Sequence, residues 1–424
     1  MSTGLLLRSR LGRKRLWHVL LPLFIGSIIA YLDRVNLAYA AITMNQDLGF
    51  TPSVFGMGAG IFFAGYVLFE IPGALIAERW SARLWLARIM VSWGVVSCLL
   101  AWVRSPAQFY AVRFLLGAAE ASYYPVAFAS LIPRWFTPQE RPAAIALMLT
   151  SLQMSAILGS PLAGWLLGQT WLGLKGWQIL FVVEAVPAVL FGAIIWRWLK
   201  DRPADAAFLT REEAAFLTEA YAQECAQKAS RECYTVWQAM RNLEVLKLSF
   251  IYFLWVTGFW GYNYWLPTAL KEASGWSNLR VGWMMVIPMT LALAGMMVVG
   301  VSASRTGEKR WHGAVPMFVG ALGLGLGTCA DSPVWAFAAA CLAGVGVYGA
   351  FGVWWSYPST FLSGAAAAAA VGLVNSCGNL GGYLGPYLTG VIKDFTGSFQ
   401  GAYFFLSLSL LGAGCLMLTL RRRT

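Results

Sequence analysis

Charge is scarce in this 424-residue chain: Asp, Glu, Lys and Arg make up only 12% of it, against about 25% in average soluble domains. A chain with so few charges cannot cover a globule with polar surface, which excludes an ordinary soluble protein. Hydrophobic residues make up 58% of the sequence, and its 44 glycines suit closely packed membrane helices. The composition therefore predicts a protein that crosses a membrane several times.

Histidine and patterned cysteine are also lacking. The two histidines lie near the ends of apolar stretches, and the seven cysteines are scattered without zinc or redox spacing. We therefore expect no histidine-based catalytic site, no metal site, and cysteines that are reduced and serve in packing. No arrangement of nucleophile and base emerges, so the chain is not predicted to be an enzyme and no cofactor is expected.

Twelve apolar stretches are long enough to cross a bilayer as helices, which takes about 20 residues each. They are expected at 16–40, 54–77, 84–103, 107–132, 142–168, 177–199, 245–270, 281–304, 312–330, 333–361, 366–392 and 399–420. The long polar segment 200–244, with a capping box at Thr210 and Glu213, separates six spans from six. The predicted fold is an all-α membrane protein of twelve transmembrane helices. It has an N-terminal six-helix bundle (1–199), a cytoplasmic linker (200–244) and a C-terminal six-helix bundle (245–424).

The basic residues are distributed unevenly about these spans. With a cytoplasmic N-terminus, 23 of the 31 lysines and arginines fall in cytoplasmic segments and five in outer segments. Such a bias predicts that both termini are cytoplasmic, and it accounts for the net charge of +12 without a nucleic acid partner. The first stretch resembles a secretory signal ending at 38–40, but Asp33 and Arg34 interrupt it, so we expect it to remain as the first helix.

Two landmarks recur at nearly the same offset in both halves. Segment 74–83 resembles 300–309 at an offset of 226 residues, and Pro161 of "SPLAG" is matched by Pro386 of "GPYLTG" at an offset of 225. These matches indicate duplication of a six-helix unit. The "GMGAG" at 56–60 repeats small residues every four positions and predicts close contact with another helix.

Several charges stand inside the predicted spans of the first half. An ionised side chain at the bilayer centre costs at least about 2.5–3.5 kcal/mol, so such residues usually face a partner or a solvent path. One face of the span at 107–132 carries residues at steps of four, three and four: Arg113, Gly117, Glu120 and Tyr124.

An apolar cavity favours the protonated form of a carboxyl group, and a nearby arginine favours the ionised form. Movement of an arginine relative to Asp33 and Glu120 would therefore couple their protonation to conformation. The alternative is a static ion pair that fastens two helices. Arg88 is expected to extend to the cytoplasmic surface and Glu70 to brace the loop at 78–83, whereas Glu184 is left without a role.

The second half has almost no buried charge and offers amides and aromatic rings instead, among them Asn263, Trp354, Trp355, Asn375 and Asn379. Amides inside a membrane can hydrogen-bond neighbouring helices. They can also bind the uncharged part of a substrate whose charge is handled by the first half.

Six segments, taken in order, resemble one known family: "LDRVNLAYA", "FFAGYVLFEIPG", "RFLLGAAEASYYP", "GWQILFVVEAVPAVL", "YWLP" and "LVNSCGNLGGYLGP". They look like the major facilitator superfamily and, more narrowly, its anion:cation symporter family of bacterial permeases for hydroxyphenylacetate, phthalate, tartrate, galactonate and glucarate, related to sialin and the vesicular glutamate transporters. The resemblance implies two pseudo-symmetric bundles and alternating access around a central site.

The resemblance also implies roles for individual residues. Asp33 and Glu120 would be the proton-coupling pair, and Arg34 and Arg113 would handle the substrate carboxylate and its coupling to those acids. Residues that would line the pocket are Tyr31, Tyr66, Gln153, Trp355, Asn375 and Asn379; Asn263 is added from the residue pattern. The sequence departs from the family pattern at Ala74, Glu78, Ser81 and Ser304 and at Ser122–Tyr124.

The predicted function is proton-coupled symport of a small organic anion across the inner membrane, by a monomer. The proton is the coupling ion, and the partners are the anion, protons and the lipid bilayer. Export or antiport is the alternative, favoured by the Gly–Pro pattern in the fifth span, and a receptor without transport is a further one. The tryptophans suit an aromatic carboxylate and the amides suit a sugar acid, so the substrate remains open.

Overall fold

The computed structural model describes residues 10–229, 241–355, 357 and 365–420. Its first half contains six helical segments. They are α2(Arg10–Arg15) continuing through η1(Leu16–Leu20) into α3(Leu21–Leu48); α4(Pro52–Arg79); α5(Ala82–Leu99) with η2(Leu100–Trp102); the series α6(Pro106–Glu120), α7(Tyr123–Pro125), η3(Val126–Leu131) and α8(Ile132–Trp135); α9(Arg141–Leu166); and α10(Gly176–Trp198). A short hairpin of β1(Thr170–Trp171) and β2(Leu174–Lys175) joins the last two.

The linker region contains η4(Pro203–Asp205) and α11(Arg211–Ala229), and 230–240 lie outside the described residues. The second half follows with six more segments. They are α13(Leu243–Ser274), α14(Asn278–Thr306), α15(Arg310–Thr328), α16(Pro333–Gly349) with α17(Phe351–Trp354), α19(Ala365–Thr396) and α20(Gln400–Leu418). Ten of the twelve segments are long and apolar enough to cross a membrane. The other two, α15 and α19, pack among them against α16 and α13.

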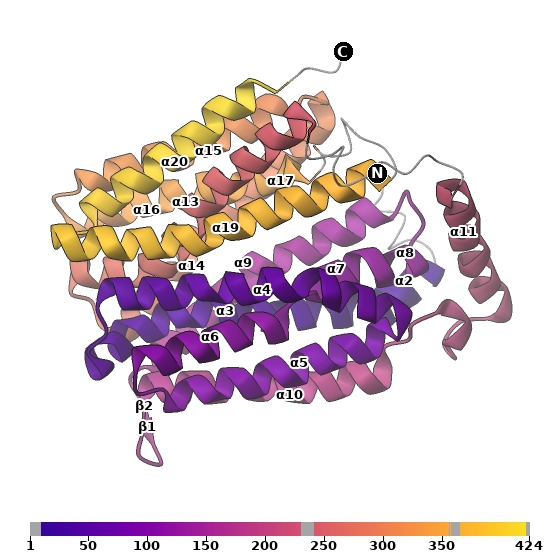
Figure 1. Ribbon diagram of the computed structural model, residues 1–424, viewed down its shortest axis with the longest axis horizontal. Coiled ribbons are helices and arrows are strands. Elements are labelled where there is room, and N and C mark those ends of the chain that lie inside the picture. Colours follow the sequence, from indigo (N-terminus) through magenta and orange to yellow (C-terminus); the bar gives the residue numbers. More distant parts are fainter. Residues whose placement is uncertain (1–9, 230–240, 356, 358–364, 421–424) are drawn as a thin grey trace.

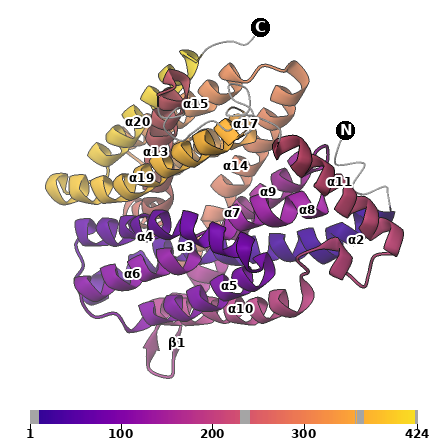
Figure 2. The same ribbon diagram turned by 45° about the vertical axis from the view of Figure 1, so that its right-hand side comes forward.

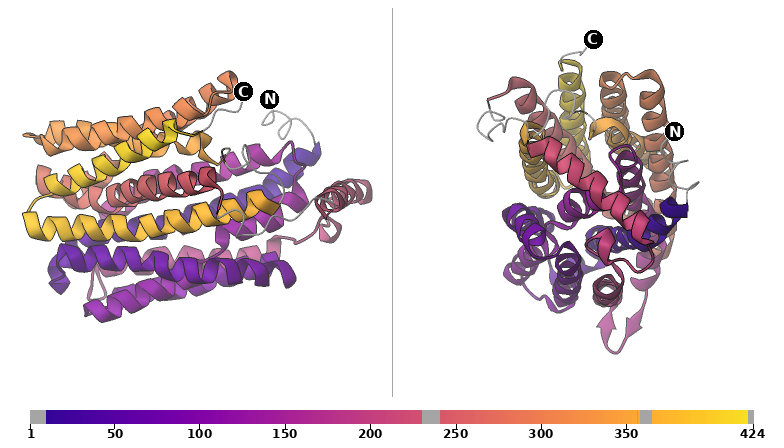
Figure 3. Two further views of the ribbon diagram at one scale, coloured as in Figure 1. Left: turned by 45° about the horizontal axis from the view of Figure 1, so that its top comes forward. Right: turned by 90° about the vertical axis from the view of Figure 1, so that its right-hand side faces the viewer.

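The halves form two adjacent layers of roughly parallel helices, with the earlier half below the later one in Figure 1. The helix α11 lies beyond one end of the layers, as the turned view in Figure 2 also shows, and the β1–β2 hairpin projects near the other. We refer to these as the linker end and the hairpin end. Viewed from the linker end, α11 crosses in front of the bundles (Figure 3).

Local sequence signals set many of the helix ends. Hydroxyl side chains at N-cap positions accept hydrogen bonds from backbone N–H groups in the first turn at Thr51, Ser81, Ser105, Ser277 and Ser332. Proline occupies the first helical position of α4, α6 and α16, where its missing N–H costs nothing. Left-handed glycines terminate α3, α13 and α14. The capping residues, prolines and glycines that are visible in the sequence therefore mark these helix ends in the structure.

The outer surface is apolar, and the mainly hydrophobic interior also holds a set of buried polar and charged groups. Large hydrophobic residues such as Leu68, Ile71 and Val298 are exposed, whereas Asp33, Arg113 and other charged groups are buried. This distribution is that of a protein whose outer surface is covered by lipid.

Backbones of the two halves approach closely toward the hairpin end. A Cβ on Gly60 of α4 would lie 2.5 Å from the Tyr383 carbonyl oxygen of α19, and one on Gly164 of α9 would lie 2.7 Å from the Asn278 carbonyl oxygen of α14. Only glycine permits these approaches, which confirms the close contact predicted for the 56–60 repeat. The contacts α4–α19 and α9–α14 occupy corresponding positions in the two halves, as expected for a duplicated unit.

Charged pairs attach the linker helix to the first half. Lys14 lies 2.6 Å from Glu213, and Arg141 makes a two-pronged pair with Glu224 at 2.7 and 2.5 Å. The predicted capping box is present, since Thr210 and Glu213 each accept from the other's backbone N–H. The Lys14 hydrogen bond, helped by the Thr210 N–H, holds the pKa of Glu213 below its ordinary value.

Two expectations about the spans were wrong. The segment expected as one helix at 107–132 is broken after Glu120, where Ala121 is extended and Ser122 has a left-handed φ of 74°. The first helix continues to Leu48 rather than ending at residue 40, because its later residues are apolar enough to pack although they include polar ones. The β1–β2 hairpin was not expected.

Candidate functional site

A buried ion pair joins the middle of α3 to the end of α6. The Arg34 Nε donates to Glu120 Oε1 at 2.6 Å, and Arg34 and Glu120 are 8% and 0% exposed. An N–H···O bond between charged groups at this distance is among the stronger ones in proteins. The Arg34 Nη2 and the Glu120 Oε2 are buried without a hydrogen-bond partner among the described residues. Each partner therefore keeps one polar group available to something else.

The break in the helix places Glu120 at the carboxyl end of α6. The helix ends where Ala121 N–H bonds the Gly117 carbonyl, and the following residues leave the helical conformation. A helix carboxyl end carries partial negative charge, which disfavours an ionised Glu120 and favours the Arg34 cation. The ionised form of Glu120 therefore depends on the arginine beside it.

Aromatic rings surround the cation. The Arg34 guanidinium carbon lies 5.1 Å from the Phe62 ring centre and 5.0 Å from that of Tyr66, both on α4. The Arg113 guanidinium lies 4.9 Å from the same Phe62 ring. Cation–π contacts of this kind contribute about 2 kcal/mol or more where water is excluded. Phe62 and Tyr66 are one turn apart, so the same face of α4 contacts both arginines.

Arg113 does not contact Glu120, as their separation of two helical turns predicts. Its guanidinium donates to the Gly58 carbonyl at 3.1 Å and to the Tyr264 hydroxyl at 3.3 Å. The second bond crosses from the first half of the chain to α13 in the second. Arg113 thereby links the two bundles beside the Arg34–Glu120 pair, and its role toward a substrate remains a prediction.

Asp33 points to a different neighbour from Arg34. Its Oδ1 accepts a short hydrogen bond from the Ser97 hydroxyl on α5, and its Oδ2 is buried without a partner among the described residues. Successive helical residues diverge in direction, so one residue faces α5 and the next faces α4 and α6. Asp33 is thus bonded to α5, whereas Arg34 is bonded to Glu120 of α6.

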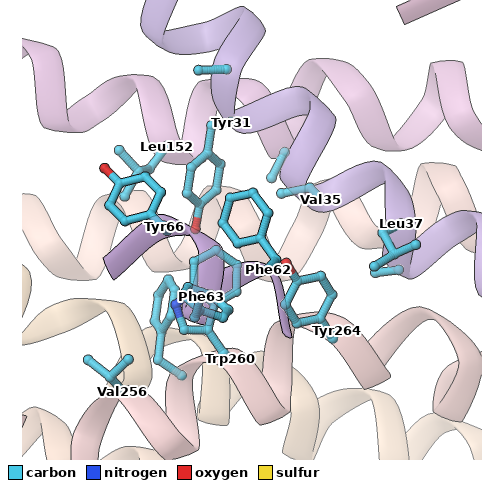
Figure 4. Close-up of a cluster of buried hydrophobic side chains, with 14 of the residues drawn as sticks. Tyr31, Val35, Leu37, Phe62, Phe63, Tyr66, Leu152, Val256, Trp260 and Tyr264 are labelled. Carbon is cyan, nitrogen blue, oxygen red and sulfur yellow. The ribbon is translucent and has the colours of Figure 1, made fainter. Parts of the chain in front are cut away.

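An aromatic cluster fills the boundary between the halves next to the ion pair (Figure 4). Trp260 of α13 stacks on Tyr264 at 5.2 Å, lies 5.1 Å from Phe63 of α4, and is 6.0 Å from Tyr31 of α3. All four residues are buried. The structure therefore brings predicted residues Tyr31 and Tyr66 together with rings from the opposite bundle.

Two predicted polar residues also bridge the halves. Gln153 of α9 is fully buried; its amide donates to Met296 Sδ of α14 at 3.6 Å, and its Oε1 has no partner among the described residues. Asn375 of α19 donates to both carboxylate oxygens of Glu70, at 3.0 and 3.1 Å. Glu70 therefore connects the bundles, and the expectation that it braces the loop at 78–83 was wrong.

The three remaining predicted residues lie in the second half of the chain. Asn263 is engaged inside the second half, where Tyr348 donates to its Oδ1 at 2.6 Å and its Nδ2 donates to the Phe259 carbonyl. Trp355 packs edge-on against Tyr252 at 5.5 Å. Asn379 is partly buried, with an amide nitrogen that has no partner in the described part of the chain.

Sequence reasoning overlooked Ser97, Phe62 and Tyr264 as site residues. Phe62 and Tyr264 stand in the quoted segments "FFAGYVLFEIPG" and "YWLP", so their aromatic character was a usable signal. Ser97 gave none, because one serine among apolar residues resembles any other. Arg88 keeps its guanidinium 4.0 Å from the Trp85 ring and donates weakly to the Ala119 carbonyl rather than extending freely to the surface.

The comparisons with known proteins agree with this architecture. The family model described as Major Facilitator Superfamily matches residues 23–386. The chain belongs to the major facilitator superfamily. It is 39% identical to a "Putative tartrate transporter" from Agrobacterium vitis. The match covers 98% of this chain and 96% of that protein. It is 34% identical over 91% of its length to a quinolone resistance transporter from Acinetobacter baumannii, covering 88% of that protein.

A solved structure shows the same superfamily fold. The D-xylose–proton symporter crystal structure superposes with a TM-score of 0.76 at 15% identity, covering 96% of this chain and 98% of that one. The twelve-helix, two-bundle fold is thereby confirmed, and the protein is a multi-pass membrane protein of a transporter superfamily.

Proposed function

We propose that this protein imports a small hydroxylated organic anion together with protons, across the bacterial inner membrane and with both termini in the cytoplasm. The observation that carries the proposal is the buried Arg34–Glu120 pair. Each member keeps one polar group without a partner among the described residues, between two bundles of a transporter fold. A fixed structural pair would be expected to satisfy those groups, because unsatisfied buried polar atoms are costly.

The pair supports proton coupling because Glu120 and the substrate carboxylate would compete for the Arg34 guanidinium. When Glu120 is ionised it binds Arg34, and when it accepts a proton that charge attraction is lost. The guanidinium is then free to take a substrate carboxylate, for which its planar donors are well suited. Proton and anion thus bind together or not at all, which is the requirement for symport. Asp33 adjoins Arg34 in the sequence and modulates the same cation.

The substrate class is inferred from buried polar groups without partners and from the relatives. Gln153 and Asn379 each hold a buried polar atom without a partner among the described residues, which suits hydroxyl groups. The named tartrate transporters are the corresponding relatives, at 39% and 40% identity. We therefore propose tartrate or a similar sugar acid, with an aromatic carboxylate as the alternative outcome because of the Trp260 cluster.

Uptake by proteoliposomes containing the purified chain tests this proposal. Radiolabelled tartrate should accumulate when an inward proton gradient is applied, and glucarate should compete better than benzoate. Glu120→Gln should abolish accumulation while tartrate exchange between the two sides persists, because Gln cannot release a proton. Glu272→Gln, an equal change in an exposed acid paired with Lys393, is the matched control. Accumulation that ignores the gradient would contradict proton coupling.

Export is a second candidate, favoured by the 34% identity to a quinolone resistance transporter. Cells loaded with norfloxacin or with tartrate distinguish the two directions. Faster energy-dependent efflux of norfloxacin, without tartrate uptake, would assign the protein to export.

A further inference from the structure

Glu184 is the buried acid that the proposed mechanism leaves unused. It lies on α10 in the apolar stretch "FVVEAVP" and is 6% exposed. Neither of its carboxylate oxygens has a hydrogen-bond partner among the described residues. Glu70 and Glu120, by contrast, are each bonded to a named neighbour. An acid held in this way needs a physical explanation.

Among the described residues, no cation pairs with Glu184 from the elements packed against α10; Lys175 of β2 is paired with Asp47. From α3 it is faced by Asp33 and Tyr39, which interact with it electrostatically. Arginines occur on α5 only at Arg83 and Arg88, toward the linker end, whereas Gly94 is the residue that packs on Ala185 and Ala188 of α10.

The helix α9, which also touches α10, has one ionisable side chain, Arg141. It is engaged at the linker end with Glu224. The segment η2 has none. An unpaired ionised carboxylate at membrane depth costs at least about 2.5–3.5 kcal/mol, and binding a proton removes that cost.

Asp33 supplies the link from Glu184 to the ion pair. Its Oδ1 accepts from Ser97 on α5, the helix that packs along α10, and its Oδ2 has no partner among the described residues. Asp33 and Glu184 lie on helices that pack together, α3 and α10, and both are buried. Two carboxylates in one apolar region cannot both ionise cheaply, so they tend to hold one proton between them. The helices α3, α5 and α10 thus enclose two acids with free oxygens and one hydroxyl donor.

We propose that Glu184 is a third proton-binding carboxyl group, which forms with Asp33 an acid pair separate from the Arg34–Glu120 pair. The inference rests on the proposed proton coupling and extends it. One proton resides on the Asp33–Glu184 pair and a second on Glu120, and both are carried with the substrate anion. Protonation of the acid pair removes negative charge beside Arg34 and so strengthens its hold on Glu120 or on the substrate carboxylate.

Infrared spectroscopy of the full-length protein in liposomes tests the site directly, whatever the protein transports. Protonated carboxyl groups absorb in a C=O stretching region separate from that of carboxylates. Glu184→Gln should remove one protonated-carboxyl band at neutral pH, and Asp33→Asn in the otherwise native chain should shift that band. Glu244→Gln, a buried acid on α13 near Lys247, should leave it unchanged. A Glu184→Gln spectrum identical to the wild type throughout the titration would overturn the inference, as would an Asp33→Asn spectrum in which the Glu184 band is unmoved.

Transport separates this inference from the proposed function. The proton-to-tartrate ratio, obtained from the membrane potential that halts net flux, should fall by one in Glu184→Gln while tartrate uptake continues. An unchanged ratio with the band lost would overturn the transported-proton role. If the wild type moves tartrate without protons but loses the band in Glu184→Gln, proton coupling fails and the carboxyl site stands.

Discussion

Removing the Asn375 amide should change the balance between the conformations of this transporter. Asn375 of α19 donates to Glu70 of α4 at 3.0 and 3.1 Å, across the boundary between the bundles. Hydrogen bonds to charged groups contribute about 1.5–3 kcal/mol. If rocking of the bundles breaks this contact, Asn375→Ala disfavours the present arrangement by that amount, which is about a 10- to 150-fold change in the conformational equilibrium.

Spin labels on the two bundles can measure the change. Arg79 at the end of α4 and Arg305 at the end of α14 are both exposed at the linker end, so cysteines there can carry labels once the seven native cysteines are replaced. Electron paramagnetic resonance should show the population with the present distance decline in Asn375→Ala. Asn379→Ala is the matched control, since the Asn379 amide nitrogen one turn away has no partner in the described residues. Equal distributions in the two variants would refute the argument.

Two further predictions concern the ends of the bundles. Burial alone would raise the pKa of Glu140, but the Arg15 guanidinium, bonded to both its oxygens at 2.7 Å, and the Thr137 groups hold that pKa below the ordinary 4.5. Glu140→Gln should therefore lower stability by about 1.5–3 kcal/mol at neutral pH. Because the stabilisation from a lowered pKa is full above the ordinary value and is lost as the pH falls through the lowered one, melting curves of variant and wild type should converge as the pH falls well below 4.5; a constant gap would refute the assignment. Gly60→Ala should slow tartrate uptake because the added Cβ would lie 2.5 Å from a backbone oxygen. Gly412→Ala, where a Cβ meets only the Leu254 side chain at 3.4 Å, should not slow it, and equal rates would show that the approach of α4 and α19 is dispensable.

The spans were predictable because lipid imposes a strong rule on each segment separately. A helix that crosses the membrane must be apolar over a fixed length, and its ends must be punctuated. Pro333 therefore marked the start of α16, which was expected there, whereas the end of the first helix at Leu48 was missed. The break at Ala121–Ser122 escaped detection because it has no glycine, and a serine in the left-handed region is uncommon.

The site was predictable only as a set of charged residues. That Asp33, Arg34 and Glu120 are buried follows from their place in apolar segments. Which of them pair depends on how helices rotate against one another, and periodicity along a single helix does not contain that information. The Glu70–Asn375 bond joins residues 305 positions apart, and no local pattern points from one to the other.

The break in the helix after Glu120 separates the part that holds the carboxylate, α6, from the helical segments that follow it. An unbroken helix from Pro106 to Trp135 would carry any tilt of its far portion straight into the carboxylate. With two non-helical residues between them, the portion from Tyr123 onward can swing toward the linker end while Glu120 keeps its register with Arg34. We therefore expect the segment from Tyr123 onward to move relative to α6, with the change in backbone direction confined to Ala121 and Ser122.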